Sequence, residues 1–229
     1  FPQLIAGPIE SFHHLGPQLN SLKCIQKKNV FPGIFMILKG LVIKFVIANR
    51  CGIIVGSFYG EILSFDGWFL LIANFLFTIQ ILFDFSGYCL IAMGIAKIVG
   101  ISLSENFLSP YKSKSLSDFW KRWHVTLHKW FKSYIFKPLV CKYPFWIAAG
   151  IVFLFSSLWH GIKLHFIIWG FVCIILLLFD KYVIQKIQLP KIIQWLVTFL
   201  MIYISWIPFR ISKTNDFIKL TQLKYKFDG

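Results

Sequence analysis

Long apolar stretches separated by short basic ones constrain this chain more than any other feature. Hydrophobic residues make up 57% of its 229 residues and charged residues 14%, whereas average soluble domains are about half apolar and about a quarter charged. This composition excludes a disordered chain and disfavours a soluble globular domain. It predicts an all-α fold, a polytopic membrane bundle of helices. Three of the clearest apolar runs cover 144–159, 165–179 and 192–209.

The charges are strongly unbalanced, with 24 Lys and Arg against 9 Asp and Glu, a formal net charge of +15. In a soluble protein such a balance suggests nucleic acid, but here the apolar runs favour basic loops beside anionic lipid headgroups. We therefore expect the lipid bilayer as a partner and no nucleic acid. The orientation that these charges favour puts 16–30, 84–143 and 181–191 in the cytoplasm and 50–67 and 160–165 outside. The basic tail over 210–229 would lie outside and supports this orientation poorly.

The first half of the chain predicts two membrane spans and an interfacial entrance. Four prolines in 1–32 exclude a long helix there, so this part is expected to be interfacial or re-entrant. The first span is predicted over 33–49, although it contains Lys39 and Lys44, which are costly at mid-bilayer unless they snorkel or face protein. Beyond it we expect a loop over 50–67, an apolar span over 68–83, a shorter helix over 88–99 and a polar segment over 102–118.

The stretch 118–136 is predicted to be one amphipathic helix at the membrane interface. At about 100° per residue, an aromatic stripe forms on one side and the basic residues gather on the other. His128 falls within the basic face and is expected to be solvated, whereas His124 falls at the edge of the stripe and is expected to look into the protein. The stripe consists of Phe119, Trp120, Trp123, Leu127, Trp130, Phe131 and Tyr134.

Histidine is the residue type in this chain best suited to acid–base chemistry at neutral pH. His160 ends an apolar run, and an ionisable residue at membrane depth is a functional candidate, although a histidine that only caps the helix end is the alternative. His165 begins the next run and is expected to be an interfacial anchor. His124 and His128 have the i, i+4 spacing of zinc ligands but lack a third ligand, so no metal site is predicted.

Other chemistries find little support in the sequence. There is no Gly-x-Ser-x-Gly, P-loop or Gly-x-Gly-x-x-Gly pattern, so a serine nucleophile is not expected. Asp84 and Asp180 are ionisable groups within apolar surroundings, and Asp84 is expected to pair with a lysine, to hold a helix break or to face a polar tunnel. The five cysteines are scattered and predict buried thiols instead of disulfides or a zinc site. They are Cys24, Cys51, Cys89, Cys141 and Cys173.

Seven sequence blocks in order resemble the membrane-bound O-acyltransferases, most closely their bacterial alginate O-acetylation branch. The most specific block is Asp-Phe-Trp-Lys-Arg-Trp-His-Val-Thr-Leu at 118–127, and Trp-His-Gly follows at 159–161. The other blocks are Phe-Pro-Gln-Leu-Ile-Ala-Gly-Pro-Ile (1–9), Gly-Leu-Val-Ile-Lys-Phe-Val-Ile-Ala (40–48), Phe-Asp-Phe-Ser-Gly-Tyr (83–88), Glu-Asn-Phe with Ser-Pro-Tyr (105–111) and Trp-Ile-Pro-Phe-Arg (206–210).

The resemblance implies a site and an activity. His160 would be the catalytic residue and His124 the second active-site position, both along a tunnel through the membrane. The implied activity is transfer of an acyl group, most simply acetyl, to hydroxyls of an exported envelope polysaccharide such as alginate or peptidoglycan. The acyl donor would be acetyl-CoA or another acyl thioester, and no cofactor would be bound. The protein would lie in the bacterial inner membrane and would act with a periplasmic acetyltransferase as its partner. Substrate-binding positions would be Asp84, Trp120, Arg122, Trp123 and Trp159.

The chain also departs from the family pattern. Family members are usually much longer, so 1–229 is expected to be one membrane-embedded domain of a fragment or truncated form. The Gly-Gly-Asn-Arg element expected after Leu139 is replaced by Val140-Cys141-Lys142, and Cys89-Leu90 stands where the branch usually has Ser-Asp. Two alternatives follow: D-alanyl transfer to teichoic acid, and a non-catalytic membrane scaffold or export component derived from the enzyme.

Overall fold

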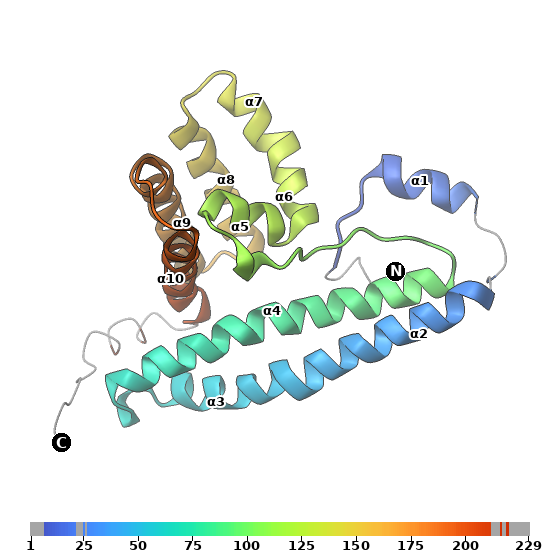
Figure 1. The fold of residues 1–229 in the computed structure, drawn as a ribbon, viewed down its shortest axis with the longest axis horizontal. Helices are drawn as coiled ribbons and strands as arrows, with labels where there is room; N and C mark the ends of the chain where they lie inside the picture. Colours follow the sequence, from blue (N-terminus) through green and yellow to red (C-terminus); the bar gives the residue numbers. More distant parts are fainter. Residues whose placement is uncertain (1–6, 22–24, 26, 212–215, 217–218, 220–229) are drawn as a thin grey trace. The chain divides into compact units, whose positions relative to one another are not determined.

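The computed structural model describes residues 7–21, 25, 27–211, 216 and 219, and this part of the chain is helical with no strand. In the described part of the chain, ten α-helices follow one another (Figure 1). They are α1 (Phe12–Asn20), α2 (Lys27–Val42), α3 (Asn49–Gly60), α4 (Gly67–Ile98), α5 (Leu116–Arg122), α6 (Val125–Phe131), α7 (Lys137–Val140), α8 (Phe145–His160), α9 (Leu164–Tyr182) and α10 (Lys191–Arg210). Short π-helical turns at Ile43–Ala48 and Lys132–Phe136 join α2 to α3 and α6 to α7.

Four helical segments in the described part are long and apolar enough to cross a membrane: Lys27–Gly60, Gly67–Ile98, Leu164–Lys186 and Lys191–Arg210. The 34 residues of Lys27–Gly60 rise about 50 Å, more than the roughly 30 Å of a hydrocarbon core. This segment therefore fits a bilayer only when tilted or when its ends extend beyond the core. The predicted all-α, multi-pass membrane fold is confirmed.

Two predicted interruptions are wrong. The loop expected over 50–67 shrinks to the short connection that follows Gly60, because 50–60 contain no proline and remain helical. The two helices expected over 68–83 and 88–99 are the single helix α4. The residues between them, 84–87, stay helical because a neighbouring helix accommodates their carboxylate and their glycine.

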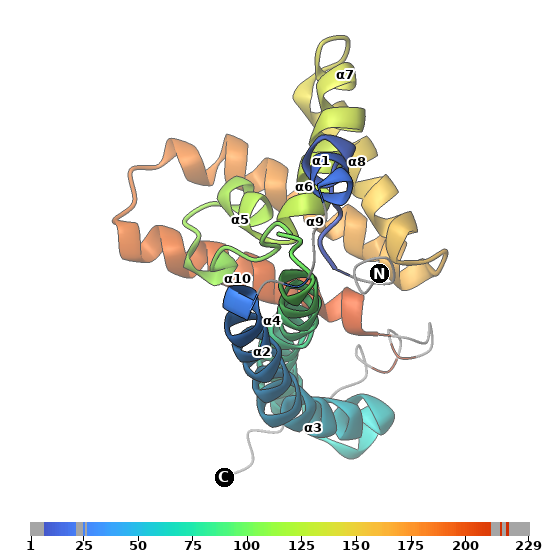
Figure 2. The same cartoon turned by 90° about the vertical axis from the view of Figure 1, so that its right-hand side faces the viewer.

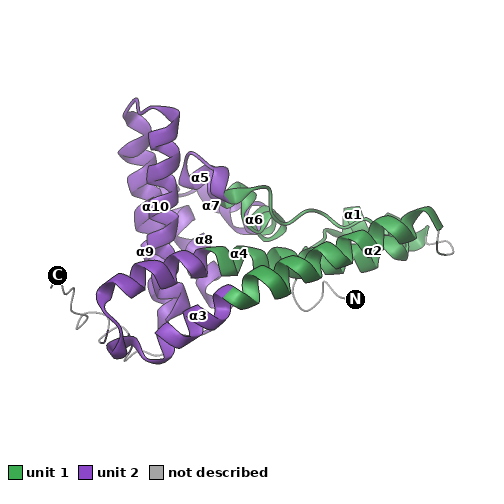
Figure 3. Cartoon of the chain, turned by 60° about the horizontal axis from the view of Figure 1, so that its bottom comes forward, with its two compact units in different colours: residues 1–50, 79–110, 120–130 green, residues 51–78, 111–119, 131–229 purple. Residues whose placement is uncertain are grey.

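The chain forms two compact units, which Figure 3 distinguishes by colour. Unit 1 comprises residues 1–50, 79–110 and 120–130, and unit 2 comprises residues 51–78, 111–119 and 131–229.

In unit 1, α2 runs alongside the second half of α4, as Figures 1 and 2 both show. The two helices meet at glycines: a Cβ on Gly40 would lie 2.6 Å from the carbonyl oxygen of Gly87, and a Cβ on Gly94 would lie 2.6 Å from that of Gly33. Beside the first contact, Lys44 and Asp84 form an ion pair. The expectation that Asp84 pairs with a lysine is confirmed, and the same pair explains how Lys44 is tolerated within a span.

The Pro-rich beginning and the following helix differ in part from expectation. Residues 1–6 and 22–24, with Pro2, Lys23 and Cys24, lie outside the described residues. The short helix α1 starts at a Ser11 cap, whose hydroxyl accepts from the His14 N–H at 3.3 Å. The first long helix begins at Lys27 and contains Pro32, six residues earlier than predicted. Pro32 lies in the second turn of α2, and because proline has no N–H, the helical bond to the Lys28 carbonyl is missing there.

In unit 2, α8, α9 and α10 match the predicted apolar runs to within about three residues at each end. Gly170 of α9 packs on Ser157 of α8, where an added Cβ would lie 2.0 Å from the serine hydroxyl. Trp169 and Trp206 stack between α9 and α10 with centroids 6.3 Å apart. The carboxylate of Asp180 accepts from the Leu116 N–H at 3.0 Å and from Gln185 at 3.0 Å, which fixes the start of α5.

The four cysteines within the described residues are free thiols. Cys89 and Cys173 are buried as predicted, but Cys51 is half-buried and Cys141 is exposed. Cys141 follows α7 in a turn between two helices. The prediction that this thiol is buried is therefore wrong.

Candidate functional site

In unit 1 the predicted amphipathic helix is interrupted at His124. The helix α5 ends at Arg122 and α6 starts at Val125, and His124 has a φ of +45°. This left-handed conformation is uncommon for a residue other than glycine and costs about 1–3 kcal/mol, so it persists only where surrounding contacts impose it. His124 is buried, with 9% of its surface exposed, which confirms that it looks into the protein.

Asn106 supplies the contacts that hold His124. Its Oδ1 lies 3.1 Å from the His124 Nδ1, and it also accepts from the N–H and the hydroxyl of Thr126 at 3.2 and 2.8 Å. The main chain adds to this, because the Val125 N–H donates to the Asn106 carbonyl at 2.9 Å. Asn106 is itself 1% exposed. A single buried amide therefore organises the break between α5 and α6.

Aromatic rings line this site. The ring of Phe85, from α4, meets the His124 imidazole edge to face with centroids 4.9 Å apart. Phe107 packs edge to face on Phe85 at 5.2 Å and on Trp123 at 5.0 Å. The imidazole thus contacts an aromatic ring on one side and hydrogen-bonds to the Asn106 amide through Nδ1.

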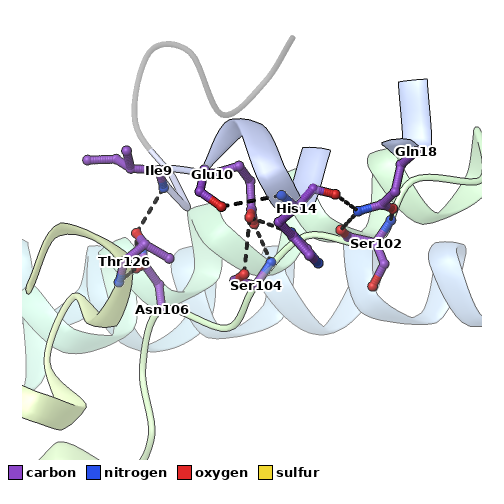
Figure 4. A network of polar contacts seen from close by, with 9 residues as sticks. Ile9, Glu10, His14, Gln18, Ser102, Ser104, Asn106 and Thr126 are labelled. Atoms are coloured by element: carbon purple, nitrogen blue, oxygen red, sulfur yellow. Dashed lines mark hydrogen bonds and ion pairs between the residues drawn. The ribbon is translucent and has the colours of Figure 1, made fainter. Parts of the chain in front are cut away.

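The segment that begins the described chain is fastened to the same place (Figure 4). The Ile9 N–H donates to the Thr126 hydroxyl at 2.8 Å. The carboxylate of Glu10, whose side chain is 3% exposed, accepts from the Ser104 N–H and from the Ser104 hydroxyl and pairs with His14. These bonds attach 9–14 to the strand-like segment 102–106 that carries Asn106.

Gln18, one helical turn further along α1, extends this attachment. Its side-chain amide donates to the Ser102 carbonyl at 3.1 Å and accepts from the Ser102 N–H at 2.8 Å. The same amide donates to the His14 carbonyl at 2.9 Å. The N-terminal segment is therefore a structural support of the His124 site.

In unit 2, His160 is the last residue of α8, and Gly161, with a φ of +139°, ends the helix directly after it. Three rings surround the imidazole: Phe209 at 5.0 Å, Trp169 at 5.4 Å and Phe166 at 5.8 Å between centroids. The rings pack on one side of the residue, and the residue as a whole is exposed. A histidine imidazole can act as a general base near neutral pH.

His165 is buried, with 8% of its surface exposed. Its ring lies against that of Phe166, with centroids 4.0 Å apart, and its place at the membrane interface stays a prediction.

The residues predicted to bind substrate fall into both units. In unit 1, Trp123 is buried against Phe107, and the half-buried Arg122 donates to the Leu108 carbonyl at 3.5 Å. Trp120, also half-buried, is in the last turn of α5. Asp84 forms an ion pair with Lys44, so its carboxylate has a structural role between α2 and α4.

Trp159 lies next to His160 in unit 2 and is 59% exposed. The structure thus gathers Trp123 and His124 into one site in unit 1, and places Trp159 and His160 at the end of α8 in unit 2.

Sequence reasoning missed Asn106, Thr126 and Glu10. Asn106 appeared in the Glu-Asn-Phe block without a role, and Thr126 follows His124 by two residues with no spacing that indicates a pair. Glu10 had one usable signal, because it is an isolated carboxylate in a segment otherwise rich in apolar residues and proline.

The residues 1–208 match the family model of the membrane-bound O-acyltransferases. The chain is 34% identical to the peptidoglycan O-acetyltransferase of Helicobacter pylori over 96% of its length and 44% of that protein. It is 33% identical to a probable alginate O-acetylase of Pseudomonas syringae over 92% of its length and 41% of that protein. It is 28% identical to the teichoic acid D-alanyltransferase of Bacillus subtilis over 74% of its length and 46% of that protein.

The chain therefore spans less than half the length of these curated relatives. The family match covers nearly all of the chain, including both histidine blocks, and the structure has the membrane-spanning helices that such a family requires. The chain belongs to the membrane-bound O-acyltransferase family.

Proposed function

We propose that this chain carries the catalytic histidines of an enzyme that transfers acetyl groups to hydroxyls of an envelope polysaccharide. The observation that carries the proposal is the environment of His160. An imidazole that packs against Phe166, Trp169 and Phe209 and is also exposed is suited to general-base catalysis, because histidine titrates near neutrality. The similarity to O-acetylating relatives supports acetyl as the transferred group.

In this mechanism His160 removes the proton from an acceptor hydroxyl as its oxygen attacks the carbonyl carbon of an acyl thioester. The tetrahedral oxyanion then collapses, the C–S bond breaks, and the imidazolium returns the proton to the leaving thiolate. The result is an ester and a free thiol, with no acyl-enzyme intermediate. His124 assists as a hydrogen-bonding residue that orients the acceptor or stabilises the developing charge.

The reaction partners follow from the same proposal. Acetyl-CoA or another acyl thioester supplies the acyl group from the cytoplasmic side, and the protein acts in the bacterial inner membrane. The acceptor is an exported polysaccharide such as peptidoglycan or alginate, reached through a periplasmic acetyltransferase partner. Two basic residues close to His124 in the chain, Lys121 and Lys129, are exposed. They would attract an anionic donor.

D-alanyl transfer to teichoic acid is the second candidate, favoured by the similarity to the Bacillus subtilis relative. Both reactions attack an activated acyl carbonyl with a hydroxyl and use the same base. The two are distinguished by the ester found on the envelope: acetate in one case and D-alanine in the other.

The test compares full-length protein with His160→Ala and His124→Ala in cells from which the chromosomal gene is deleted. His13→Ala is the matched control, because His13 is an exposed histidine of α1 outside both sites. Envelope acetate and D-alanine esters are released by mild alkali and quantified, and membrane protein levels are measured in parallel. Loss of a general base is expected to reduce ester formation about 10²- to 10⁴-fold, with the control unchanged.

The outcomes separate the candidates. Loss of acetate esters in His160→Ala at normal protein level supports the proposal, whereas loss of D-alanine esters supports the second candidate. If the deletion abolishes the esters and His160→Ala retains them, the chain is a scaffold and not the catalyst. If the deletion leaves both kinds of ester intact, envelope acylation is not its function.

A further inference from the structure

We propose that Asn106 is a positioning residue that fixes His124 as the tautomer with the proton on Nδ1, so that Nε2 accepts a hydrogen bond from a hydroxyl of the acceptor other than the one that His160 deprotonates. This inference rests on the proposed function, in which His124 assists at the reacting centre. It narrows the two roles left open for His124 to one, a hydrogen-bond acceptor.

The first step is the orientation of the Asn106 amide. A backbone N–H is always a donor, and the N–H of Thr126 points to one terminal atom of the Asn106 side chain at 3.2 Å. That atom must therefore be the carbonyl oxygen Oδ1. The amide nitrogen faces the other way, toward the Cys89 thiol of α4 at 3.5 Å, which agrees with this assignment.

The second step is the proton on His124. Its Nδ1 lies 3.1 Å from the same Oδ1, and an amide oxygen has lone pairs and no proton to give. The contact is a hydrogen bond only when Nδ1 carries the hydrogen. In a neutral imidazole the proton on one nitrogen leaves a lone pair on the other, so Nε2 is an acceptor.

The third step is the rigidity of the arrangement. Oδ1 receives three donors, from His124, Thr126 N–H and the Thr126 hydroxyl. The hydroxyl in turn accepts from the Ile9 N–H at 2.8 Å, so its own proton is directed to Oδ1. With Asn106 buried and the His124 backbone held at a φ of +45°, neither partner can rotate without breaking several bonds.

The choice of an amide also controls charge. A carboxylate at position 106 would stabilise the imidazolium and favour protonation of His124, whereas a neutral amide supports the neutral ring. The ionisable groups next to the contacts of His124 come from several elements of unit 1. Cys89 of α4 contacts Asn106, the ion-paired Asp84 precedes the ring partner Phe85 in the chain, Glu105 precedes Asn106, and Arg122 and His128 belong to the same segment as His124.

The direct test reads the tautomer in the full-length wild-type protein by ¹⁵N solid-state NMR with labelled histidine in lipid bilayers. The His124 signals are identified by their loss in His124→Ala. The expected result at neutral pH is a protonated Nδ1 and an unprotonated Nε2 for His124. A protonated Nε2 would overturn the proposal, whatever the activity of the enzyme.

The functional test uses Asn106→Asp, which retains an oxygen for all three donors. Acetyl transfer is measured against pH in membranes with radiolabelled acetyl-CoA as donor. The acidic limb of the profile is expected to move up by about one pH unit, because an opposite charge beside His124 raises its pKa and the neutral form is needed. Cys89→Ala, which removes only the contact of the amide nitrogen, is expected to leave the limb in place, and Asn106→Leu is expected to lose about tenfold in rate or more.

The outcomes separate this inference from the proposed function. If His124→Ala abolishes transfer but Asn106→Asp leaves the acidic limb unmoved, the positioning role is wrong and the proposed function stands. If His124→Ala retains full transfer, the proposed role of His124 fails first. A purely structural Asn106 would lower protein level in Asn106→Leu without any shift of the pH profile in Asn106→Asp.

Discussion

The glycine contact between α2 and α4 yields the sharpest stability prediction. An alanine Cβ at Gly40 would lie 2.6 Å from the Gly87 carbonyl oxygen, whereas ordinary van der Waals contact begins at 3.4 Å. The atom in the way belongs to a helix backbone and cannot rotate aside, so the helices must separate by about 0.8 Å. Overpacking of this kind costs about 1–3 kcal/mol, against a helix-propensity gain of roughly 0.5–1 kcal/mol for Gly→Ala.

We therefore expect Gly40→Ala to lower the free energy of unfolding by about 1–2 kcal/mol, since close packing replaces the hydrophobic effect as the attraction between helices in lipid. Gly56→Ala is the matched control, because Gly56 is also helical and nothing lies within 4 Å of an added Cβ. Thermal unfolding of the full-length protein in detergent is followed by size-exclusion chromatography. Equal melting temperatures for the two variants, or a rise in both, would refute the close approach of the helices.

Substitutions at two further sites test polar contacts between helices and segments. Asp84→Asn is expected to destabilise by about 2–3 kcal/mol, because it leaves the Lys44 charge unpaired within a span, and Lys44→Met with Asp84→Leu is expected to recover most of the melting temperature; a double variant no better than the single one contradicts the pair. Asp180→Ala leaves the buried Leu116 N–H without its acceptor and is expected to cost about 1–3 kcal/mol. Asp180→Asn retains one oxygen for that N–H, and its NH2 group can donate to the Gln185 side-chain oxygen once the Gln185 amide turns over, so this variant is expected to melt closer to wild type than Asp180→Ala.

The helices that sequence predicts well are those with one continuous environment. The runs over α8, α9 and α10 are apolar on nearly every side, and α8 and α10 begin directly after prolines, at Pro144 and Pro190. Length and composition alone then fix their type and their ends. Interactions with other segments are not needed to explain them.

The sequence predictions fail where contacts with a segment distant in the chain determine the local structure. Asp84 and Gly87 indicated an interruption of α4, but Lys44 neutralises the first and the α2 backbone requires the second. Similarly, the aromatic stripe assumed one straight helix over 118–136. Its first part is buried at Phe119 and Trp123, while Tyr134 beyond the break is exposed. A helical wheel predicts the inward direction of the His124 side chain, but it cannot predict the left-handed backbone at this residue, which depends on contacts outside the helix.

The contacts of Asn106 explain why three separated sequence blocks occur together in this chain. Ile9 belongs to the first block, Asn106 to the Glu-Asn-Phe block and Thr126 to the block that contains His124. A chain of hydrogen bonds runs from the Ile9 N–H through the Thr126 hydroxyl to Asn106 and His124. The Thr126 hydroxyl takes part in two of these bonds, and the Asn106 oxygen also takes part in two. A change in any of the three blocks therefore alters the support of the histidine. The three blocks therefore belong to one hydrogen-bond network, and the chemistry of His124 depends on residues more than a hundred positions away in the sequence.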